Sequence, residues 1–234
     1  PGTAGYLAQL SLGRVHDLES FRDAAARWKL PTENLVYADV DGNIGWVASG
    51  LAPVRHWSGL LPVPGDGRYE WDGFLDTEQL PQSINPPSGV ISTANHNILP
   101  PGYPHQLAYE WDADWRARRL EDVLGRGRQL TVEDFARLQH DALSLPAQAM
   151  VPALLEAARR TGRGDAWALT TLGGWDFTMR KESTAAALYT MWWRAVGDRV
   201  YRPVAGEHAA LFTGLWDTPT LVAIARGDTA VSRA

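Results

Sequence analysis

The pattern of hydrophobic and polar positions divides the chain into a first part that favours strands and loops and a second part that favours helices. Near the start, apolar residues recur at helical spacing from Phe21 to Trp28, and Asp17 is a suitable N-cap residue. These features predict a helix from Asp17 to about Lys29 with a single apolar face. Pro31 ends it, because proline lacks the backbone N–H that a helix interior requires.

Two β-prone runs, residues 34–39 and 43–48, follow this helix. Between them lies Asp41-Gly42, a pair that favours the tight turn of a β-hairpin because glycine readily adopts a positive φ. We therefore predict an antiparallel hairpin over these residues.

Residues 59–89 are rich in Pro and Gly, which predicts a long loop. Loops of this length inside a compact domain are usually functional. Because the segment carries Trp71 and Phe74, we expect it to pack as a structured lining. Aromatic side chains close to Glu70 and Asp72 also leave open a non-catalytic module that binds carbohydrate or another apolar ligand.

The most informative stretch begins with residues 85–89, a cluster of turn-forming residues that excludes a helix. Residues 90–94 are β-prone, and we predict a short buried strand there. Alternation along that strand would place Ile91, Thr93 and Asn95 on one face. Asn95 would then present an amide donor at a strand end, the type of group that stabilises an oxyanion. The alternative is that Asn95 and its neighbours only shape a turn.

The second part of the chain contains further segments with helical spacing and recognisable ends. They cover residues 112–124, 131–140, 147–160 and 182–199, and a short helix is expected after Asp217. Strands and loops followed by helices are typical of an α+β protein. We expect residues 1–111 to form a sheet and loop part and residues 112–234 a mainly helical part of the same domain, without an independent linker.

Arg116 lies early in the predicted helix 112–124, where a positive charge opposes the helix dipole. An arginine in that position needs a partner, and Asp112 or a more distant group would serve. One interpretation of Arg116 is a structural ion pair at the surface. The other is a supporting role at a functional site.

Composition narrows the classes of protein that remain. The 234 residues carry a formal net charge of −5, which argues against the basic surface of a nucleic-acid-binding protein. The absence of cysteine excludes disulfides, thiol nucleophiles and thiolate metal sites. No apolar run reaches the roughly 18 residues of a transmembrane helix. Eleven Trp residues favour aromatic packing in the core and loops, with ligand binding as the alternative.

Several familiar catalytic motifs are missing from the sequence. The chain has no glycine-rich phosphate loop, no His-Glu-x-x-His pair and no Gly-x-Ser-x-Gly elbow. On a strand, Glu70 and Asp72 would share a face. A glycosidase, however, needs two carboxyl groups on either side of a sugar, which sequence neighbours seldom provide.

A series of other short motifs follows in a fixed order. They are Asn34-Leu-Val-Tyr-Ala-Asp-Val-Asp-Gly-Asn-Ile-Gly45, Pro53-Val-Arg55, Leu61-Pro-Val-Pro-Gly65, Tyr69-Glu-Trp-Asp-Gly73, Leu80-Pro81, Asn85-Pro-Pro-Ser-Gly89, Thr93-Ala-Asn95, Tyr103-Pro104, Arg116-Ala-Arg-Arg-Leu120, Leu138-Gln-His-Asp141 and Gly174-Trp-Asp176. In this order they resemble the β-chain of the penicillin acylase (penicillin amidase) family, in the N-terminal-nucleophile hydrolase superfamily. Each motif alone is weak evidence, but their succession covers most of the chain from about Asp17 to Trp193.

The resemblance implies part of an αββα sandwich, with residues 34–48 and 90–94 in its sheets and a helical region after Asp112. It also implies an enzyme that cuts the amide bond between an acyl group and an amine. In this family the nucleophile is the Ser at the amino terminus of the β-chain, and its own α-amine acts as the base. Backbone donors and one Asn side chain form the oxyanion hole. By this resemblance Asn95 is the oxyanion donor, and Arg116 supports the nucleophile and that Asn.

The resemblance further implies that this chain is an internal fragment of the β-chain, because Pro1 carries neither a hydroxyl nor a thiol. We expect the nucleophile to lie upstream and the fragment alone to be inactive. Expected partners are a small acyl amide substrate, the α-chain and the rest of the β-chain, and the fragment is expected to self-associate through uncovered sheet edges. The acyl group stays open between aromatic and long-chain types, and family members are commonly periplasmic or secreted.

Some family members bind calcium, partly through a carboxylate shortly after a Tyr-Pro pair. Here Tyr103-Pro104 is followed by His105, Gln106 and Leu107, none of which supplies a carboxylate. We therefore expect no metal or cofactor from these residues and leave calcium open for the parent protein.

Overall fold

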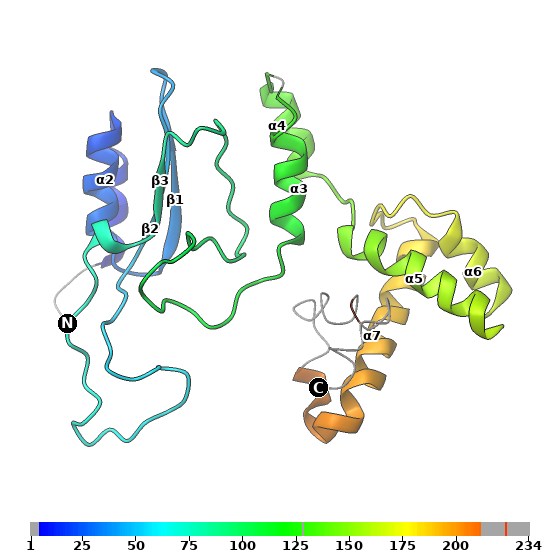
Figure 1. Cartoon of the computed structure of the whole chain (residues 1–234). Coiled ribbons are helices and arrows are strands. Elements are labelled where there is room, and N and C mark those ends of the chain that lie inside the picture. The colour runs from blue at the N-terminus through cyan, green and yellow to red at the C-terminus, as the bar shows by residue number, and fades with distance from the viewer. Residues whose placement is uncertain (1–4, 128, 212–222, 224–234) are drawn as a thin grey trace. The chain divides into compact units, whose positions relative to one another are not determined.

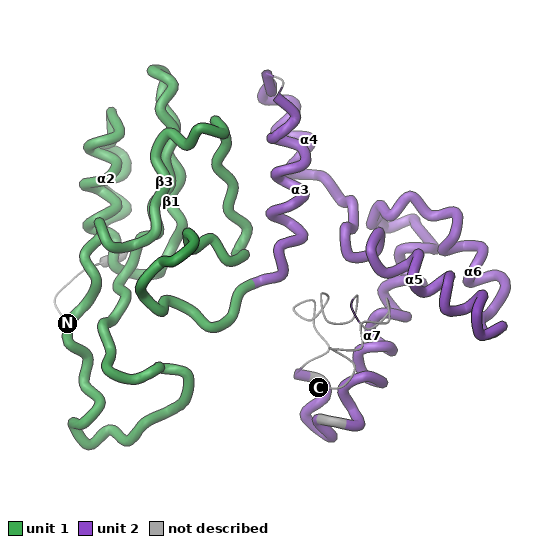
Figure 2. The backbone as a smooth tube through the Cα atoms, viewed as in Figure 1, with its two compact units in different colours: residues 1–111 green, residues 112–234 purple. Residues whose placement is uncertain are grey.

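The computed structural model describes residues 5–127, 129–211 and 223 of the chain (Figure 1). It divides into two compact units, Pro1–Trp111 and Asp112–Ala234 (Figure 2). The first combines a small sheet with helices and long loops, and the second is helical.

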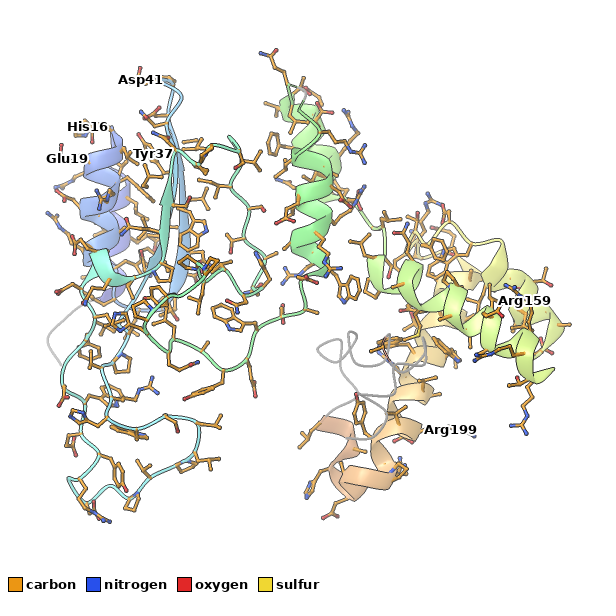
Figure 3. All side chains as sticks on the ribbon, in the orientation of Figure 1. His16, Glu19, Tyr37, Asp41, Arg159 and Arg199 are labelled. Atoms are coloured by element: carbon orange, nitrogen blue, oxygen red, sulfur yellow. The ribbon has the colours of Figure 1, made fainter. Side chains whose placement is uncertain are left out.

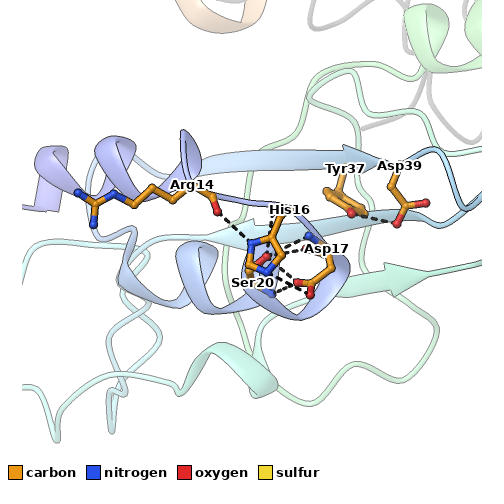
Figure 4. Close-up of polar contacts among 6 residues, drawn as sticks. All are labelled: Arg14, His16, Asp17, Ser20, Tyr37 and Asp39. Atoms are coloured by element: carbon orange, nitrogen blue, oxygen red, sulfur yellow. Dashed lines mark hydrogen bonds and ion pairs between the residues drawn. The ribbon is translucent and has the colours of Figure 1, made fainter.

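The first unit begins with η1 (Gly5–Ala8), α1 (Gln9–Leu12) and α2 (Leu18–Arg27). Asp17 caps α2: its Oδ1 accepts from the Ser20 N–H at 2.7 Å, and the Ser20 hydroxyl oxygen accepts from the Asp17 N–H at 3.1 Å (Figure 4). The hydrogen bond from the Ser20 side chain lowers the pKa of the Asp17 carboxyl. The predicted helix and its N-cap are confirmed.

The sheet contains β1 (Glu33–Ala38), β2 (Ile44–Ser49) and β3 (Gln82–Ile84), all antiparallel in the order β1-β2-β3. β1 and β2 form the predicted hairpin. Its turn places Gly42 at φ 88°, a value that glycine adopts without steric cost. Strand β3 lies inside the segment that the sequence predicted as loop.

Helix α2 covers one face of this sheet (Figure 1). Phe21 and Ala25 of α2 form a buried cluster with Val47 of β2, and Leu35 of β1 packs against it. Leu35 and Val47 are cross-strand partners, so their neighbours Asn34 and Ala48, which also pair, point to the opposite face.

Polar side chains stiffen the end of the hairpin, where Asp41 is labelled at the tip (Figure 3). Asp39 accepts hydrogen bonds from the Asn43 backbone N–H at 2.8 Å, the Asn43 side chain at 2.8 Å and the Tyr37 hydroxyl at 2.9 Å. These bonds, led by that from the Asn43 side chain, lower the pKa of Asp39. Desolvation and the bond to Asp39 raise the pKa of Tyr37 to about 12 (Figure 4).

The second unit is built from five α-helices and a final 3₁₀ segment among the described residues. They are α3 (Trp115–Leu124), α4 (Val132–Gln139), α5 (Leu145–Thr161), α6 (Ala166–Gly173), α7 (Thr184–Ala205) and η3 (Gly206–Leu211). Thr131 and Asp134 form the capping box of α4, and Gly162 ends α5 at φ 63°.

The core of the second unit gathers where α5, α6 and α7 pack together. Its buried residues are Ala147, Met150, Val151, Leu172, Trp175, Ala185, Ala186, Tyr189 and Trp193. Four of these residues, Ala185, Ala186, Tyr189 and Trp193, come from α7.

The sequence analysis was incomplete in this second unit. It did not predict α6, although Asp165 caps that helix by accepting from the Ala168 N–H at 2.9 Å. Helix α3 begins at Trp115 rather than Asp112, and Asp114 in its N-cap position makes no side-chain capping hydrogen bond. The helix predicted after Asp217 falls in a part of the chain of which only residue 223 is described. Within the described ranges, no helix has both the length and the apolar character needed to cross a membrane.

Candidate active-site segment

The stretch from Asn85 to Tyr103 does not contain the strand predicted at Val90–Ala94. That prediction is wrong. The expected alternation, which placed Ile91, Thr93 and Asn95 on one face of the strand, is therefore wrong as well. The sheet instead ends with β3, directly before Asn85. Pro86 and Pro87 carry no N–H for a ladder, and β-prone residues form a strand only where a partner strand is available.

Asn85 anchors the beginning of this segment to the sheet. Its backbone N–H donates to the Ile44 carbonyl at 2.9 Å, and its Oδ1 accepts from the Ile44 N–H at 2.9 Å. Its Nδ2 donates to Asn43 Oδ1 at 3.0 Å. Asn85 has a φ of 46°, in the left-handed region that Asn tolerates better than most residues. The chain therefore turns sharply as it leaves β3.

A second anchor lies at Thr93. Asn34 Nδ2 donates to Thr93 Oγ1 at 2.9 Å, and both groups are partly buried. Since Asn34 points to the sheet face opposite α2, the segment crosses that face. Further along, the Tyr103 hydroxyl donates to the Gln79 carbonyl at 2.7 Å, and burial raises the pKa of Tyr103.

Asn95 lies two residues after the anchor at Thr93. Ala94 is buried with 6% of its surface exposed, whereas Asn95 is exposed. The backbone of Asn95 has a φ of 61°, again in the left-handed region. The amide is therefore carried on a sharp turn beside a buried residue. Its role as an oxyanion donor stays a prediction.

Arg116 belongs to the second unit, where it lies in the first turn of α3. Its Nη2 contacts Asp112 Oδ2 at 2.8 Å, so the predicted ion pair is present, and 60% of its side chain is exposed. Arg118 makes an equivalent contact with Asp114 at 2.8 Å, with 57% of its side chain exposed. Because Asn95 and Arg116 lie in different units, their pairing stays a prediction.

A less exposed ion pair, which the sequence did not reveal, joins α3 to the residue Asp141 that follows α4. Arg119 contacts Asp141 at 2.6 Å, with side-chain exposures of 23% and 20%. The hydrogen bond between them lowers the pKa of Asp141 and raises that of Arg119. Both residues occur in short motifs of the sequence, Arg116–Leu120 and Leu138–Asp141. These motifs were the only indication in the sequence that pointed to Arg119 and Asp141.

The aromatic loop of the first unit is structured, as its composition predicted. Its two arms pair through Val54 N–H to the Gly73 carbonyl at 3.0 Å and Asp72 N–H to the Val54 carbonyl at 3.0 Å. Trp71 and Phe74 meet edge to face with ring centroids 5.7 Å apart. Their exposed fractions are 57% and 44%.

These rings border a concavity of about 420 Å³ on the first unit. It is lined by Tyr69, Glu70, Trp71, Gly73 and Phe74. Asp72 instead contacts His56 across the loop. Glu70 and Asp72 therefore have different surroundings in a loop, and they do not lie on a strand.

The described residues form no evident metal site. Within the part that the structure describes, no group of three His, Asp or Glu side chains gathers to hold an ion. The three residues directly after Tyr103-Pro104, which are His105, Gln106 and Leu107, supply no carboxylate. Calcium stays open for the longer protein, and no step of the proposed reaction involves a metal.

Comparison with known proteins decides the family. The family model described as penicillin amidase matches residues 1–232. The chain belongs to the penicillin amidase family. The resemblance drawn from the motifs is thereby confirmed.

Named relatives within the penicillin amidase family are acylases. The chain is 33% identical over 196 residues to acyl-homoserine lactone acylase QuiP of Pseudomonas aeruginosa, covering 76% of this chain and 23% of that protein. It is 34% identical over 216 residues to penicillin acylase 2 proenzyme of Pseudomonas sp. (strain SE83), covering 86% of this chain and 28% of that protein. The chain thus spans about a quarter of the length of these relatives.

A solved penicillin amidase structure agrees with the fold. The thermostable penicillin G acylase from Alcaligenes faecalis superposes with a TM-score of 0.71 at 23% identity, covering 90% of this chain and 40% of that one. The likeness supports the predicted α+β fold of the N-terminal-nucleophile hydrolase type.

Proposed function

We propose that this chain is part of a longer amide hydrolase of the penicillin acylase type. The proposed substrate is a small N-acyl amide, a class suggested by relatives named for penicillin and for acyl-homoserine lactones. The observation that carries the proposal is the family match over residues 1–232. The nucleophilic Ser is assigned to a preceding segment of the same protein, so this chain alone is expected to be inactive.

The proposed reaction begins when the Ser hydroxyl attacks the amide carbon while its own α-amine takes the proton. The carbonyl oxygen becomes an oxyanion, and Asn95 donates its side-chain N–H to that oxygen. As the tetrahedral intermediate collapses, the α-ammonium gives its proton to the leaving amine and an acyl-enzyme remains, which water then hydrolyses to the free acid and the regenerated Ser. The exposed position of Asn95 on a sharp, anchored turn supports this assignment.

Substitution of Asn95 in the full-length protein tests the proposal. Removal of an oxyanion donor costs about 100-fold to 1,000-fold in kcat, so Asn95→Ala should lower turnover of a chromogenic N-acyl amide by at least 100-fold. Asn97→Ala is the matched control: Asn97 is also exposed, and its side chain only accepts from the Leu99 N–H at 3.1 Å. Unchanged turnover in folded, processed Asn95→Ala would refute the assignment.

The supporting role proposed for Arg116 can be compared with Arg118 on the same helix, which makes a similar ion pair and also lies over the Trp115 ring at 5.2 Å. Arg116 and Arg118 have similar exposures and equal 2.8 Å contacts to an Asp four residues earlier. If Arg116 only made a surface ion pair, Arg116→Ala and Arg118→Ala would have equally small effects. We expect turnover to fall by about tenfold or more with Arg116→Ala alone. Equal effects of the two substitutions would contradict the role.

The proposed partners are the remaining segments of the same precursor, including the α-chain, and the proposed location is periplasmic or secreted.

The aromatic concavity beside Glu70 favours a second, non-catalytic role in binding carbohydrate. Calorimetry with simple sugars tests that role. Saturable binding that Trp71→Ala abolishes would support this second role, and the absence of binding would exclude it for these sugars.

A further inference from the structure

A side-chain hydrogen bond joins strand β1 to the middle of the segment that carries Asn95. Asn34 Nδ2 donates to Thr93 Oγ1 at 2.9 Å, and the two residues are 59 positions apart in sequence. The bond therefore reflects the path of the folded chain rather than local turn geometry. Only Ala94 separates Thr93 from Asn95.

The donor of this bond is held firmly. Asn34 lies in β1, where it pairs with Ala48 of β2, and its side chain is half-buried. A residue inside a paired strand has its backbone fixed by the ladder, so the direction of its side chain varies little. Asn34 is therefore a fixed point from which to hold the neighbouring segment.

The acceptor transmits that restraint to the backbone. Thr93 is β-branched, and its χ1 angle has few allowed values, so a hydrogen bond to Oγ1 also restrains its backbone. Ala94 is buried and cannot shift freely in a packed site. Asn95 comes next, at a φ of 61°. The sheet therefore restrains the Asn95 backbone through the hydrogen bond to Thr93 and the burial of Ala94.

Two further anchors, at Asn85 and Tyr103, lie further from Asn95 along the chain. Asn85 is bonded to Ile44 and Asn43, and the Tyr103 hydroxyl is bonded to the Gln79 carbonyl at 2.7 Å. These bonds hold the two ends of the segment. The Asn34–Thr93 bond restrains its middle, beside the amide.

We propose that Asn34 is a positioning residue for the amide hydrolysis, which holds Thr93 and so directs the Asn95 amide toward the oxyanion. This inference rests on the proposed function of Asn95. Its consequence is kinetic: loss of the Asn34–Thr93 bond should weaken stabilisation of the transition state while substrate binding stays nearly unchanged.

The test uses the full-length, processed enzyme, with kcat and KM for a chromogenic N-acyl amide measured per titrated active site. Thr93→Val removes the hydroxyl and keeps the shape, whereas Thr93→Ser keeps the hydroxyl. Asn34→Leu removes the same bond from the other side and serves if Thr93→Val does not fold. Tyr103→Phe is the matched control, since it also removes one hydroxyl that bonds across to another segment.

A misplacement of about 1 Å can cost about 100-fold in rate, so partial loosening should lower kcat about tenfold in Thr93→Val and Asn34→Leu. KM should change by less than about twofold, and Thr93→Ser and Tyr103→Phe should stay within about twofold of the parent in kcat. In an Asn95→Ala background, Thr93→Val should cause no further loss, because the group that it positions is gone.

Each other outcome overturns the inference in a recognisable way. An equal loss of kcat in Tyr103→Phe would mean that the segment needs general rigidity rather than this bond. A tenfold loss that persists in the Asn95→Ala background would mean that Thr93 acts through another group. If Asn95→Ala alone leaves turnover unchanged, the proposed function fails first, and the role of Asn34 fails with it.

Discussion

The turn that leads from β3 into the candidate active-site segment depends on Asn85 for two separate reasons. Its side chain accepts from the Ile44 N–H at 2.9 Å and donates to Asn43 Oδ1 at 3.0 Å. Its φ of 46° is also costly for a residue with an ordinary side chain. Asn85→Gly removes the hydrogen bonds and tolerates that φ, whereas Asn85→Ala removes the bonds and is strained.

The two contributions can be given magnitudes. Hydrogen bonds of an exposed side chain contribute modestly, so we assign about 1 kcal/mol to the loss in Asn85→Gly. Alanine at a positive φ costs about 1 kcal/mol more than glycine. We therefore expect the free energy of unfolding to fall by about 1 kcal/mol in Asn85→Gly and by about 2 kcal/mol in Asn85→Ala.

Urea denaturation followed by tryptophan fluorescence measures both changes. Asn97 provides the control, because it is exposed but does not lie in the left-handed region. There the order should reverse, with Gly less stable than Ala by about 0.5 kcal/mol through the entropy of the unfolded chain. If Ala is no worse than Gly at position 85, the backbone argument for this turn is refuted.

Two further predictions concern the second unit. Met150→Ala should lower the free energy of unfolding by about 2 to 5 kcal/mol because Met150 is 1% exposed in the core, whereas the same change at Met191, which is 73% exposed, should cost less than about 0.5 kcal/mol. Equal losses in urea denaturation would contradict the assigned core. The pKa of Asp141 is lowered by Arg119, so the folded state prefers the carboxylate, and its contribution is present above the ordinary Asp pKa of 3.8 and is lost as pH falls below it. Asp141→Asn should therefore flatten the decline of stability between about pH 5 and pH 2, and an unchanged slope in acid titrations would count against the pair.

Local interactions allowed the sequence to predict several elements directly. Asp17 caps α2 within its own first turn, and Asp41-Gly42 closes the hairpin between adjacent strands. Thr131 and Asp134 form their capping box inside a single turn of chain. In each case the groups that stabilise the element lie within a few residues of it, so no tertiary contact was needed.

The sequence failed to predict elements that depend on contacts with distant parts of the chain. Residues 90–94 are β-prone, but a strand also needs a neighbouring backbone with free donors and acceptors, and β3 at Gln82–Ile84 takes the place beside β2. Helix α6 has a recognisable cap at Asp165, yet it is short and contributes Leu172 to a core made largely by α5 and α7. Packing against those helices stabilises a short helix that isolated residues would not form.

By itself, then, the sequence determined the family, the α+β class, the hairpin and most helices, together with Asn95 and Arg116 as candidates. Only the tertiary structure decided that Asn34 holds Thr93 and that Arg119 pairs with Asp141, contacts between residues 59 and 22 positions apart. Such pairs form where the folded backbone brings distant segments together. Sequence spacing carries no information about that path, whereas caps and tight turns are encoded within one turn of chain.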